Sequence, residues 1–253
     1  MSPISRRKLI TAGFATAVVG VAGLAAADRI ARRYGLIPPD DGGIYGPGET
    51  LTYAVQRLLT THEPVRQFPR RMISKAPFAN EAPALSPAFW QMRDRGFSDW
   101  RVSVDGMVAH PISLSLAGLK SLPVRSQITE VACEEGWSYI AEWTGTPLVE
   151  VLRAAGMSPQ ARYVVYFSID PTWWDSIDMN DALHPDTLLT WGRNGADLPV
   201  PFGGPLRLRV PRQLGYKNIK YITRLTATDN LKSFGDGTGS IEPATGYTWY
   251  AGI

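Results

Sequence analysis

The chain has 253 residues, of which 44% are hydrophobic and 19% charged, and its formal net charge is +3. A chain of this length can bury a sizeable core, and the composition is that of a globular protein. The small positive charge, without a run of Lys or Arg in the body of the chain, gives no reason to expect a nucleic-acid partner and is compatible with an anionic ligand.

The N-terminus resembles an export signal. Ser5-Arg6-Arg7-Lys8 precedes an apolar stretch from Leu9 to Ala27 that is rich in Ala, Val, Gly and Leu, as in twin-arginine signals. Ala25-Ala26-Ala27 resembles a cleavage site, and a retained membrane anchor is the alternative. We expect residues 1–27 to direct a folded protein to the periplasm or to the outer face of the cytoplasmic membrane.

The segment that follows has weak patterning and ends in a proline-rich stretch. Residues 28–64 are expected to be a linker or lead-in, with a short helix over 52–60. The prolines between Pro64 and Pro87 predict an irregular extended arm that wraps over a domain.

From Trp100 onward, short strands with few helices predict an α+β domain with a mixed β-sheet. The run over 126–133 is a strand that ends at Cys133, and the apolar run over 163–169 is a strand buried on both faces. The remaining expectations are a hairpin over 100–108 with its turn at 105–106, a helix after a strand over 113–120, a turn over 143–148, a helix over 148–155, a short helix at 181–182, and strands over 206–210, 221–228 and 247–250.

Cys133 is the single cysteine, so an internal disulfide is excluded. Its neighbours Glu134, Glu135 and Trp137 differ from those of a cysteine that only fills a core. The three histidines form no ligand-spaced pair, which argues against a zinc or copper site made from protein alone. A cysteine hydrolase that pairs Cys133 with His184 stays open.

Two glycine-containing segments with basic residues follow. The first is Gly203-Gly204-Pro205-Leu206-Arg207, and the second runs from Arg212 to Lys220 around Gly215. Such loops can hold a phosphate through amide and ammonium groups, although each could also be a solvated basic surface. Together with the lone thiol, they favour an anionic cofactor.

Several motifs resemble those of the molybdopterin-binding domain of the sulfite oxidase family, in order and spacing, over about residues 65–253. Within that family the chain is similar to exported bacterial members that include protein-methionine-sulfoxide reductases. The motifs are Asp105-Gly106, Cys133-Glu134-Glu135-Gly136-Trp137-Ser138, Trp143-x-Gly145-x-Pro147-Leu148, Leu198-Pro199, Gly203-Gly204-Pro205-Leu206-Arg207-Leu208 and Gly215-Tyr216-Lys217-x-x-Lys220.

The resemblance implies a Mo-molybdopterin cofactor with one pyranopterin dithiolene and one molybdenum atom, to which Cys133 supplies a thiolate. It implies catalytic roles for Tyr250 and Glu135 near the oxygen ligand of the metal. The cofactor-binding residues that it implies are Asn80, Cys133, Ser168, Arg207, Asn218, Ile219 and Lys220.

The chain departs from the family pattern at two places. Phe202 stands where relatives carry Asn or His before a Gly-Ala-Pro sequence, so a polar cofactor contact is missing. Val131 and Ala132 stand where sulfite-oxidising members carry basic residues, which favours sulfoxide reduction over sulfite oxidation. The sequence has no haem-binding region, so we expect a separate electron-transfer partner such as a membrane cytochrome. The alternative is a cofactor-free exported binding or assembly module that kept the fold.

Overall fold

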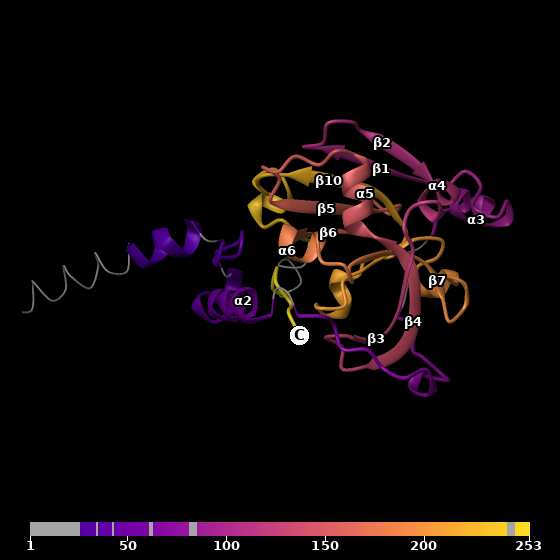
Figure 1. Ribbon diagram of the computed structural model, residues 1–253, viewed down its shortest axis with the longest axis horizontal. Coiled ribbons are helices and arrows are strands. Elements are labelled where there is room, and N and C mark those ends of the chain that lie inside the picture. The colour runs from indigo at the N-terminus through magenta and orange to yellow at the C-terminus, as the bar shows by residue number, and fades with distance from the viewer. Residues whose placement is uncertain (1–25, 34, 42, 61–62, 81–84, 242–245) are drawn as a thin grey trace, which may run out of the picture.

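The computed structural model describes residues 26–33, 35–41, 43–60, 63–80, 85–241 and 246–253, so the predicted export signal lies almost entirely outside the described residues. Two sheets form the body of the molecule, one in the upper part of Figure 1 and the other in the lower part. Among the described residues, no helix is long and apolar enough to cross a membrane.

The first sheet has the order β2-β1-β10-β5-β6 and is mixed, because β1 and β10 are parallel while the other pairs are antiparallel. The second sheet has the order β3-β4-β7-β8, with β9 paired to β7, and is antiparallel. The bounds are β1 Arg101–Gly106, β2 Ile112–Ser115, β3 Arg125–Ala132, β4 Ser138–Pro147, β5 Tyr163–Ser168, β6 Trp174–Asp178, β7 Leu188–Arg193, β8 Ala196–Asp197, β9 Arg207–Arg209 and β10 Ile222–Thr228.

Short helices connect and cover these sheets. The α-helices are α2 Pro47–Leu59, α3 Pro87–Asp94, α4 Leu116–Lys120, α5 Leu148–Ala154 and α6 Met179–Ala182, and the 3-10 turns are η1 Gly43–Tyr45, η2 Arg70–Met72, η3 Val200–Phe202, η4 Gly215–Lys217 and η5 Gly235–Gly237. The predicted α+β class with a mixed sheet is therefore confirmed.

Strand β5 explains why the core has two layers. Val164 and Tyr166 pack in the main hydrophobic cluster, whereas Val165 packs with Trp249 and Tyr250 on the opposite face. Because alternate residues of a strand point to opposite faces, an apolar run without polar interruptions is what such a strand requires.

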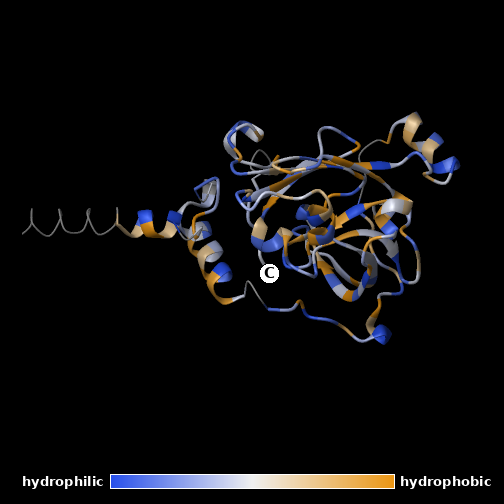
Figure 2. Ribbon diagram, turned by 45° about the horizontal axis from the view of Figure 1, so that its top comes forward, coloured by the Kyte–Doolittle hydropathy of each residue, from blue (hydrophilic) through white to orange (hydrophobic). Residues whose placement is uncertain are grey.

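Buried ion pairs and a hydrogen bond connect helix α2 to the rest of the protein. Arg57 forms ion pairs of 2.8 Å with both Asp178 and Asp181, and Tyr53 donates a 2.7 Å hydrogen bond to Asp178. The helix has both hydrophobic and hydrophilic segments (Figure 2), and its polar contacts with α6 and the end of β6 fix it beside the C-terminal segment.

The predicted arm is extended where it is described. The Phe68 amide donates to the Ile128 carbonyl at 2.9 Å, and the Ser74 amide donates to the Ile140 carbonyl at 2.9 Å, so the arm runs along β3 and β4.

Three predictions were wrong. Residues 143–147 are the second half of β4 and Leu148 begins α5, because Gly145 permits a close approach of strands: a Cβ there would lie 2.4 Å from the Leu189 carbonyl oxygen. Gly106 ends β1 and the connection to β2 is 107–111, so 105–106 is not the hairpin turn. Residues 247–250 form no strand, since the tail pairs only by a bridge between Gln213 and Gly252.

Other elements differ in extent or were not predicted. The helix expected over 52–60 begins five residues earlier, at Pro47. Helix α3, strands β6 and β7 and the first half of β4 were not predicted.

Candidate active site around Cys133

Cys133 lies in the loop between β3 and β4. Ala132 and Ser138 are the last paired residues of this hairpin, and the Cys133 amide donates to the Trp137 carbonyl at 2.9 Å. Gly136 closes the loop with a φ of 89°, a conformation that glycine adopts without strain. The hairpin therefore places the thiol at the end of a strand, as the sequence predicted.

The thiol faces a cavity of about 290 Å³. The wall opposite Cys133 comes from the segment between η3 and β10, and the C-terminal segment closes another side. The lining residues are Asn80, Val131, Cys133, Glu134, Glu135, Trp137, Tyr139, Trp173, Phe202, Arg207, Gly215, Tyr216, Asn218, Ile219, Lys220, Ile241 and Tyr247.

Gly215 allows the basic loop to pack directly on Cys133. A Cβ at residue 215 would lie 3.2 Å from Cys133 Sγ and 3.3 Å from its Cβ, which is tighter than ordinary contact. Any larger residue would displace either the thiol or the loop.

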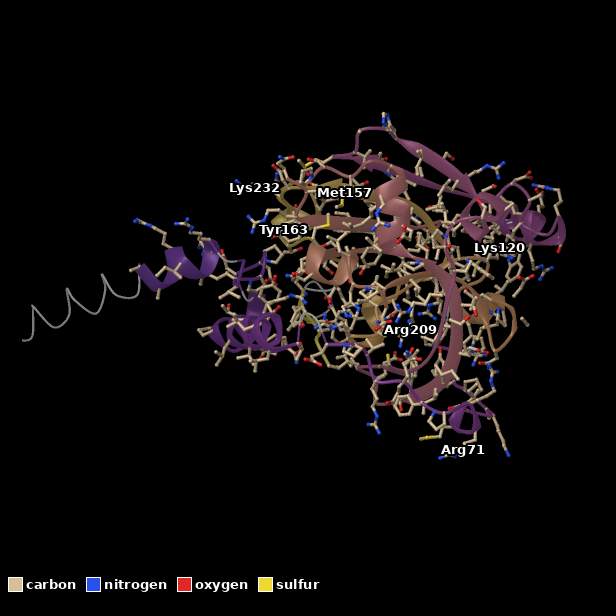
Figure 3. The ribbon with its side chains drawn as sticks, viewed as in Figure 1. Arg71, Lys120, Met157, Tyr163, Arg209 and Lys232 are labelled. Carbon is tan, nitrogen blue, oxygen red and sulfur yellow. The ribbon has the colours of Figure 1, made fainter. Side chains whose placement is uncertain are left out.

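Three cations are buried beside the cavity: Arg207, Arg209 and Lys220 are each less than 5% exposed. Arg207 donates to the Phe202 carbonyl at 2.9 Å and the Asn218 carbonyl at 2.6 Å, and Lys220 donates to the Asn80 and Pro201 carbonyls at 3.0 and 2.7 Å. Arg209 lies near the centre of the molecule (Figure 3).

None of these three cations forms an ion pair with a carboxylate in the part of the chain that the structure describes. The Nε atoms of Arg207 and Arg209 also have no hydrogen-bond partner among those residues. Buried charges are normally paired, so this cluster is complementary to an anion.

Burial and mutual repulsion shift the pKa values of these cationic groups. Burial, and then the neighbouring Arg207, lowers the pKa of Lys220 to about 7. The same two causes lower the pKa of Arg209, and burial lowers the pKa of Arg207. An anion in the cavity would oppose all three shifts, because it favours the charged forms.

Acidic groups surround the thiol itself. Cys133 Sγ lies 3.1 Å from Glu134 Oε2 and 3.8 Å from Glu135 Oε2, and Trp137 Nε1 donates to Glu135 Oε2 at 2.6 Å. Burial, together with a hydrogen bond to Glu134 and the charges of both glutamates, raises the pKa of Cys133 to about 12. Without a metal, the sulfur is therefore a protonated thiol at neutral pH.

This electrostatic setting argues against the hydrolase alternative. A nucleophilic cysteine needs a lowered pKa and an adjacent base. His184 does not line the cavity: its Nε2 lies 3.2 Å from the Glu63 carbonyl oxygen, and its Nδ1 accepts the Asp186 amide at 3.2 Å.

Most of the predicted cofactor and catalytic residues come together here. Cys133, Glu135, Asn80, Arg207, Asn218, Ile219 and Lys220 all line the cavity. The Asn218 side chain, however, is used within the protein, because its Oδ1 accepts from Arg209 and from the Val210 amide, both at 2.7 Å. Asn218 therefore holds the basic loop in shape.

Two predicted residues do not line this cavity. Ser168 is buried at the end of β5, where its Oγ accepts the Asp170 amide at 3.3 Å. Tyr250 packs against α2, with its ring centroid 5.0 Å from that of Tyr53 and 4.6 Å from the Arg57 guanidinium. Their cofactor and catalytic roles stay predictions.

The aromatic lining was not assigned from sequence. Tyr247 lines the cavity and stacks on Tyr216, with ring centroids 5.2 Å apart, and Trp137 and Trp173 also face it. Trp137 was already part of the cluster expected around Cys133, whereas the only signal for Tyr247 was the aromatic run that it shares with Tyr250.

Phe202, the departure from the family pattern, has a structural role. Its ring lies 3.9 Å from the guanidinium carbon of Arg193 and packs edge-on against Tyr139. Phe202 thus covers another buried cation and lines the cavity with an apolar surface.

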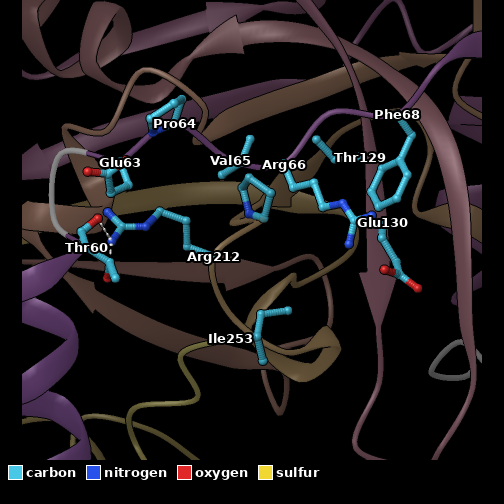
Figure 4. A pocket seen from close by; sticks show the side chains of 11 residues that line it. Thr60, Glu63, Pro64, Val65, Arg66, Phe68, Thr129, Glu130, Arg212 and Ile253 are labelled. Atoms are coloured by element: carbon cyan, nitrogen blue, oxygen red, sulfur yellow. Dashed lines mark hydrogen bonds between the residues drawn. The ribbon is translucent and has the colours of Figure 1, made fainter.

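A separate hollow of about 290 Å³ lies further along β3, at Thr129 and Glu130 (Figure 4). Arg212 donates to Thr60 Oγ1 there at 3.0 Å. None of its lining residues lines the Cys133 cavity, and it has no thiol, so this hollow is separate from the Cys133 site.

Comparison with known proteins shows the family to which the chain belongs. The family model described as "Oxidoreductase molybdopterin binding domain" matches residues 90–233, and the chain belongs to this family.

Two of the similar proteins are named as subunits of protein-methionine-sulfoxide reductase. A protein of Azospira oryzae, named for a protein-methionine-sulfoxide reductase subunit, YedZ1, is 38% identical over 162 residues, which cover 64% of this chain and 59% of that protein. The protein-methionine-sulfoxide reductase catalytic subunit MsrP of Xanthomonas axonopodis is 31% identical over 242 residues, which cover 89% of this chain and 70% of that protein. The chain thus spans about three-fifths of the Azospira protein.

Among solved structures, the sulfane dehydrogenase SoxCD of Paracoccus pantotrophus matches with a TM-score of 0.51 at 22% identity. The match covers 57% of this chain and 40% of that one, and it supports the fold.

The residues present fit a molybdenum-pterin cofactor. The cavity has a single thiol for the metal, and the described residues contain no group of three His, Cys, Asp or Glu side chains that could bind a metal alone. A cofactor that brings its own sulfur ligands and an anionic group would complete the metal site and neutralise Arg207, Arg209 and Lys220.

Proposed function

We propose that this chain is an exported molybdenum oxidoreductase that transfers an oxygen atom and reduces sulfoxides. The observation that carries the proposal is the cavity in which a lone thiol faces buried cations that have no acidic partner among the described residues. The balanced reaction takes a sulfoxide, two electrons and two protons to a thioether and water.

The bound cofactor would supply the two-electron redox chemistry at one molybdenum atom per chain. Cys133 would hold the metal, while Arg207, Lys220 and the backbone of residues 218–220 would hold the pterin and its phosphate. Glu135, kept in place by Trp137, lies close enough to Cys133 to donate or accept a proton beside the metal.

Sulfoxide reduction is preferred over sulfite oxidation because of charge. Glu134 and Glu135 flank the thiol together with Trp137 and Val131, whereas the anionic group of the cofactor would neutralise Arg207 and Lys220 in the same cavity. The acidic side chains beside the thiol would then repel the sulfite anion and accept a neutral sulfoxide with apolar substituents.

Location and electron supply belong to the same proposal. The twin-arginine-like sequence over residues 1–27 supports export to the periplasm or the outer face of the membrane. Electrons would come from a separate partner, such as a membrane cytochrome.

Elemental analysis of the purified protein tests the proposal directly. We expect about one molybdenum atom per chain in the wild type and reduction of methionine sulfoxide with a reduced viologen dye. Cys133→Ser should lose the metal and the activity, whereas Ser138→Ala in the same hairpin should keep both. A folded wild type without molybdenum, expressed in cells that make the cofactor, would instead support the cofactor-free binding module.

A further inference from the structure

A groove of about 560 Å³ opens next to the Cys133 cavity, between α2 and the C-terminal segment. Glu134, Tyr216 and Tyr247 line both spaces, so the groove and the cavity share a wall. Figure 1 shows α2 beside the C-terminal end of the chain. The full lining is Tyr45, Gly48, Glu49, Thr52, Glu134, Leu214, Tyr216, Gly246, Tyr247, Thr248 and Tyr250.

The groove is aromatic and acidic. Four tyrosines and two glutamates line it, and its lining contains no basic residue among the described part of the chain. Tyrosine faces and carboxylates both attract ammonium and guanidinium groups. The lining is therefore complementary to a cation attached to an apolar stem.

Within the groove, Glu49 is a specific site for such a cation. The residue is 5% exposed, and its Oε1 accepts the Tyr250 amide at 3.3 Å, while its Oε2 has no hydrogen-bond partner among the described residues. Burial, and then the nearby charge of Asp40, raises the pKa of Glu49 to about 7. A buried carboxylate oxygen without a donor favours a ligand that brings one.

Glu134 is positioned at the junction of groove and cavity. In the metal-free protein it accepts a hydrogen bond from the Cys133 thiol at 3.1 Å. Glu134 therefore extends the acidic lining of the groove to the edge of the cavity.

We propose that the groove binds the polypeptide around an oxidised methionine, and that Glu49 and Glu134 make a neighbouring Lys or Arg the preferred flanking residue. This inference rests on the proposed sulfoxide reductase function. The methionine sulfoxide side chain enters the Cys133 cavity, and the basic side chain lies along the tyrosines toward Glu49.

The test compares three blocked pentapeptides that carry methionine sulfoxide followed by Lys, Ala or Glu. We expect kcat/KM to fall in that order, with roughly a tenfold difference between Lys and Glu, and the difference to shrink at high salt. Glu49→Gln and Glu134→Gln should each reduce the preference, and the control Asp99→Asn, an exposed acid on a distant loop, should preserve it.

A binding readout complements the kinetics. In fluorescence anisotropy with the labelled Lys peptide and the full-length protein, Glu49→Gln and Glu134→Gln should each weaken binding, and Asp99→Asn should leave it unchanged.

Because Glu49→Gln could disturb folding, Thr52→Lys is a second probe. Thr52 is exposed on the same wall of the groove, and a lysine there should reduce or reverse the preference for the Lys peptide. Equal kcat/KM for all three peptides would overturn the groove proposal and leave the reductase function standing. No reduction of any sulfoxide by the molybdenum-loaded protein would instead overturn the proposed function.

Discussion

Arg207 and Lys220 face each other across an antiparallel β-bridge, and both side chains are buried beside the Cys133 cavity. Two like charges so close together, without an acidic partner among the described residues, destabilise the protein that lacks an anion. The site therefore carries an electrostatic cost that a bound anion removes.

The first prediction concerns Lys220 and pH. Its folded pKa of about 7 lies below the 10.5 of an ordinary lysine, so between these values the unfolded chain binds more protons than the folded one. The cost of the buried charge is fully present below pH 7 and is relieved as the pH rises. We expect the Tm of the metal-free protein to rise from pH 7 to pH 9.

Lys220→Met should flatten this rise, whereas Lys120→Met, at an exposed lysine, should leave the slope unchanged. A thermal unfolding series across these pH values measures the effect. A wild-type Tm that falls over this range would contradict the assignment.

The second prediction concerns Gly215. Gly215→Ala would push a methyl group to 3.2 Å from Cys133 Sγ, so we expect loss of most of the bound molybdenum with a small change in stability. Gly118→Ala is the matched control, since its new Cβ would lie no closer than 3.4 Å to any neighbour. The test is to measure the metal content and Tm of both variants. Full metal occupancy in Gly215→Ala would refute the close-packing argument.

The third prediction concerns the reactivity of Cys133. With a pKa of about 12, the thiol of the metal-free protein should react with iodoacetamide more slowly than an exposed cysteine, by at least about tenfold at pH 8. The rate should still be rising at pH 10. The same thiol in guanidinium chloride provides the reference, and its rate should level off near the ordinary cysteine pKa.

The fourth prediction concerns Arg57 in α2. Arg57→Met leaves Asp178 and Asp181 buried without their main cation, which should cost about 3–5 kcal/mol of unfolding free energy. Tyr53→Phe removes one hydrogen bond to Asp178 and should cost about 1–3 kcal/mol. Arg32→Met, at an exposed ion pair, should stay within about 0.5 kcal/mol in urea unfolding.

The sequence predicted which residues meet on the Cys133 side of the cavity because its signals there are local. The strand that ends at Cys133 and the basic loop around Gly215 are short sequence patterns. Each can be recognised without knowing which segments pack against it. The aromatic side could not be predicted in this way. Whether Tyr247 or Tyr250 faces Cys133 depends on α2, whose Tyr53 and Arg57 hold the Tyr250 ring against the other face of the tail.

The errors in the fold have a related cause. Gly145 was interpreted as a turn residue, but its role is to let β4 approach β7, and this need is visible only when both strands are placed. Local propensity does not record contacts between segments that are distant in sequence.

The C-terminal segment closes one side of the Cys133 cavity. Tyr247 is a wall of the cavity, and the Leu214 amide, next to Gly215, donates to the Ala251 carbonyl at 2.9 Å. Gln213 connects the same loop to Asp181, which also binds Arg57 of α2. The cavity around Cys133 is thus complete only when residues 246–253 are docked against the loop at Gly215, so removal of this segment would open the cavity on that side.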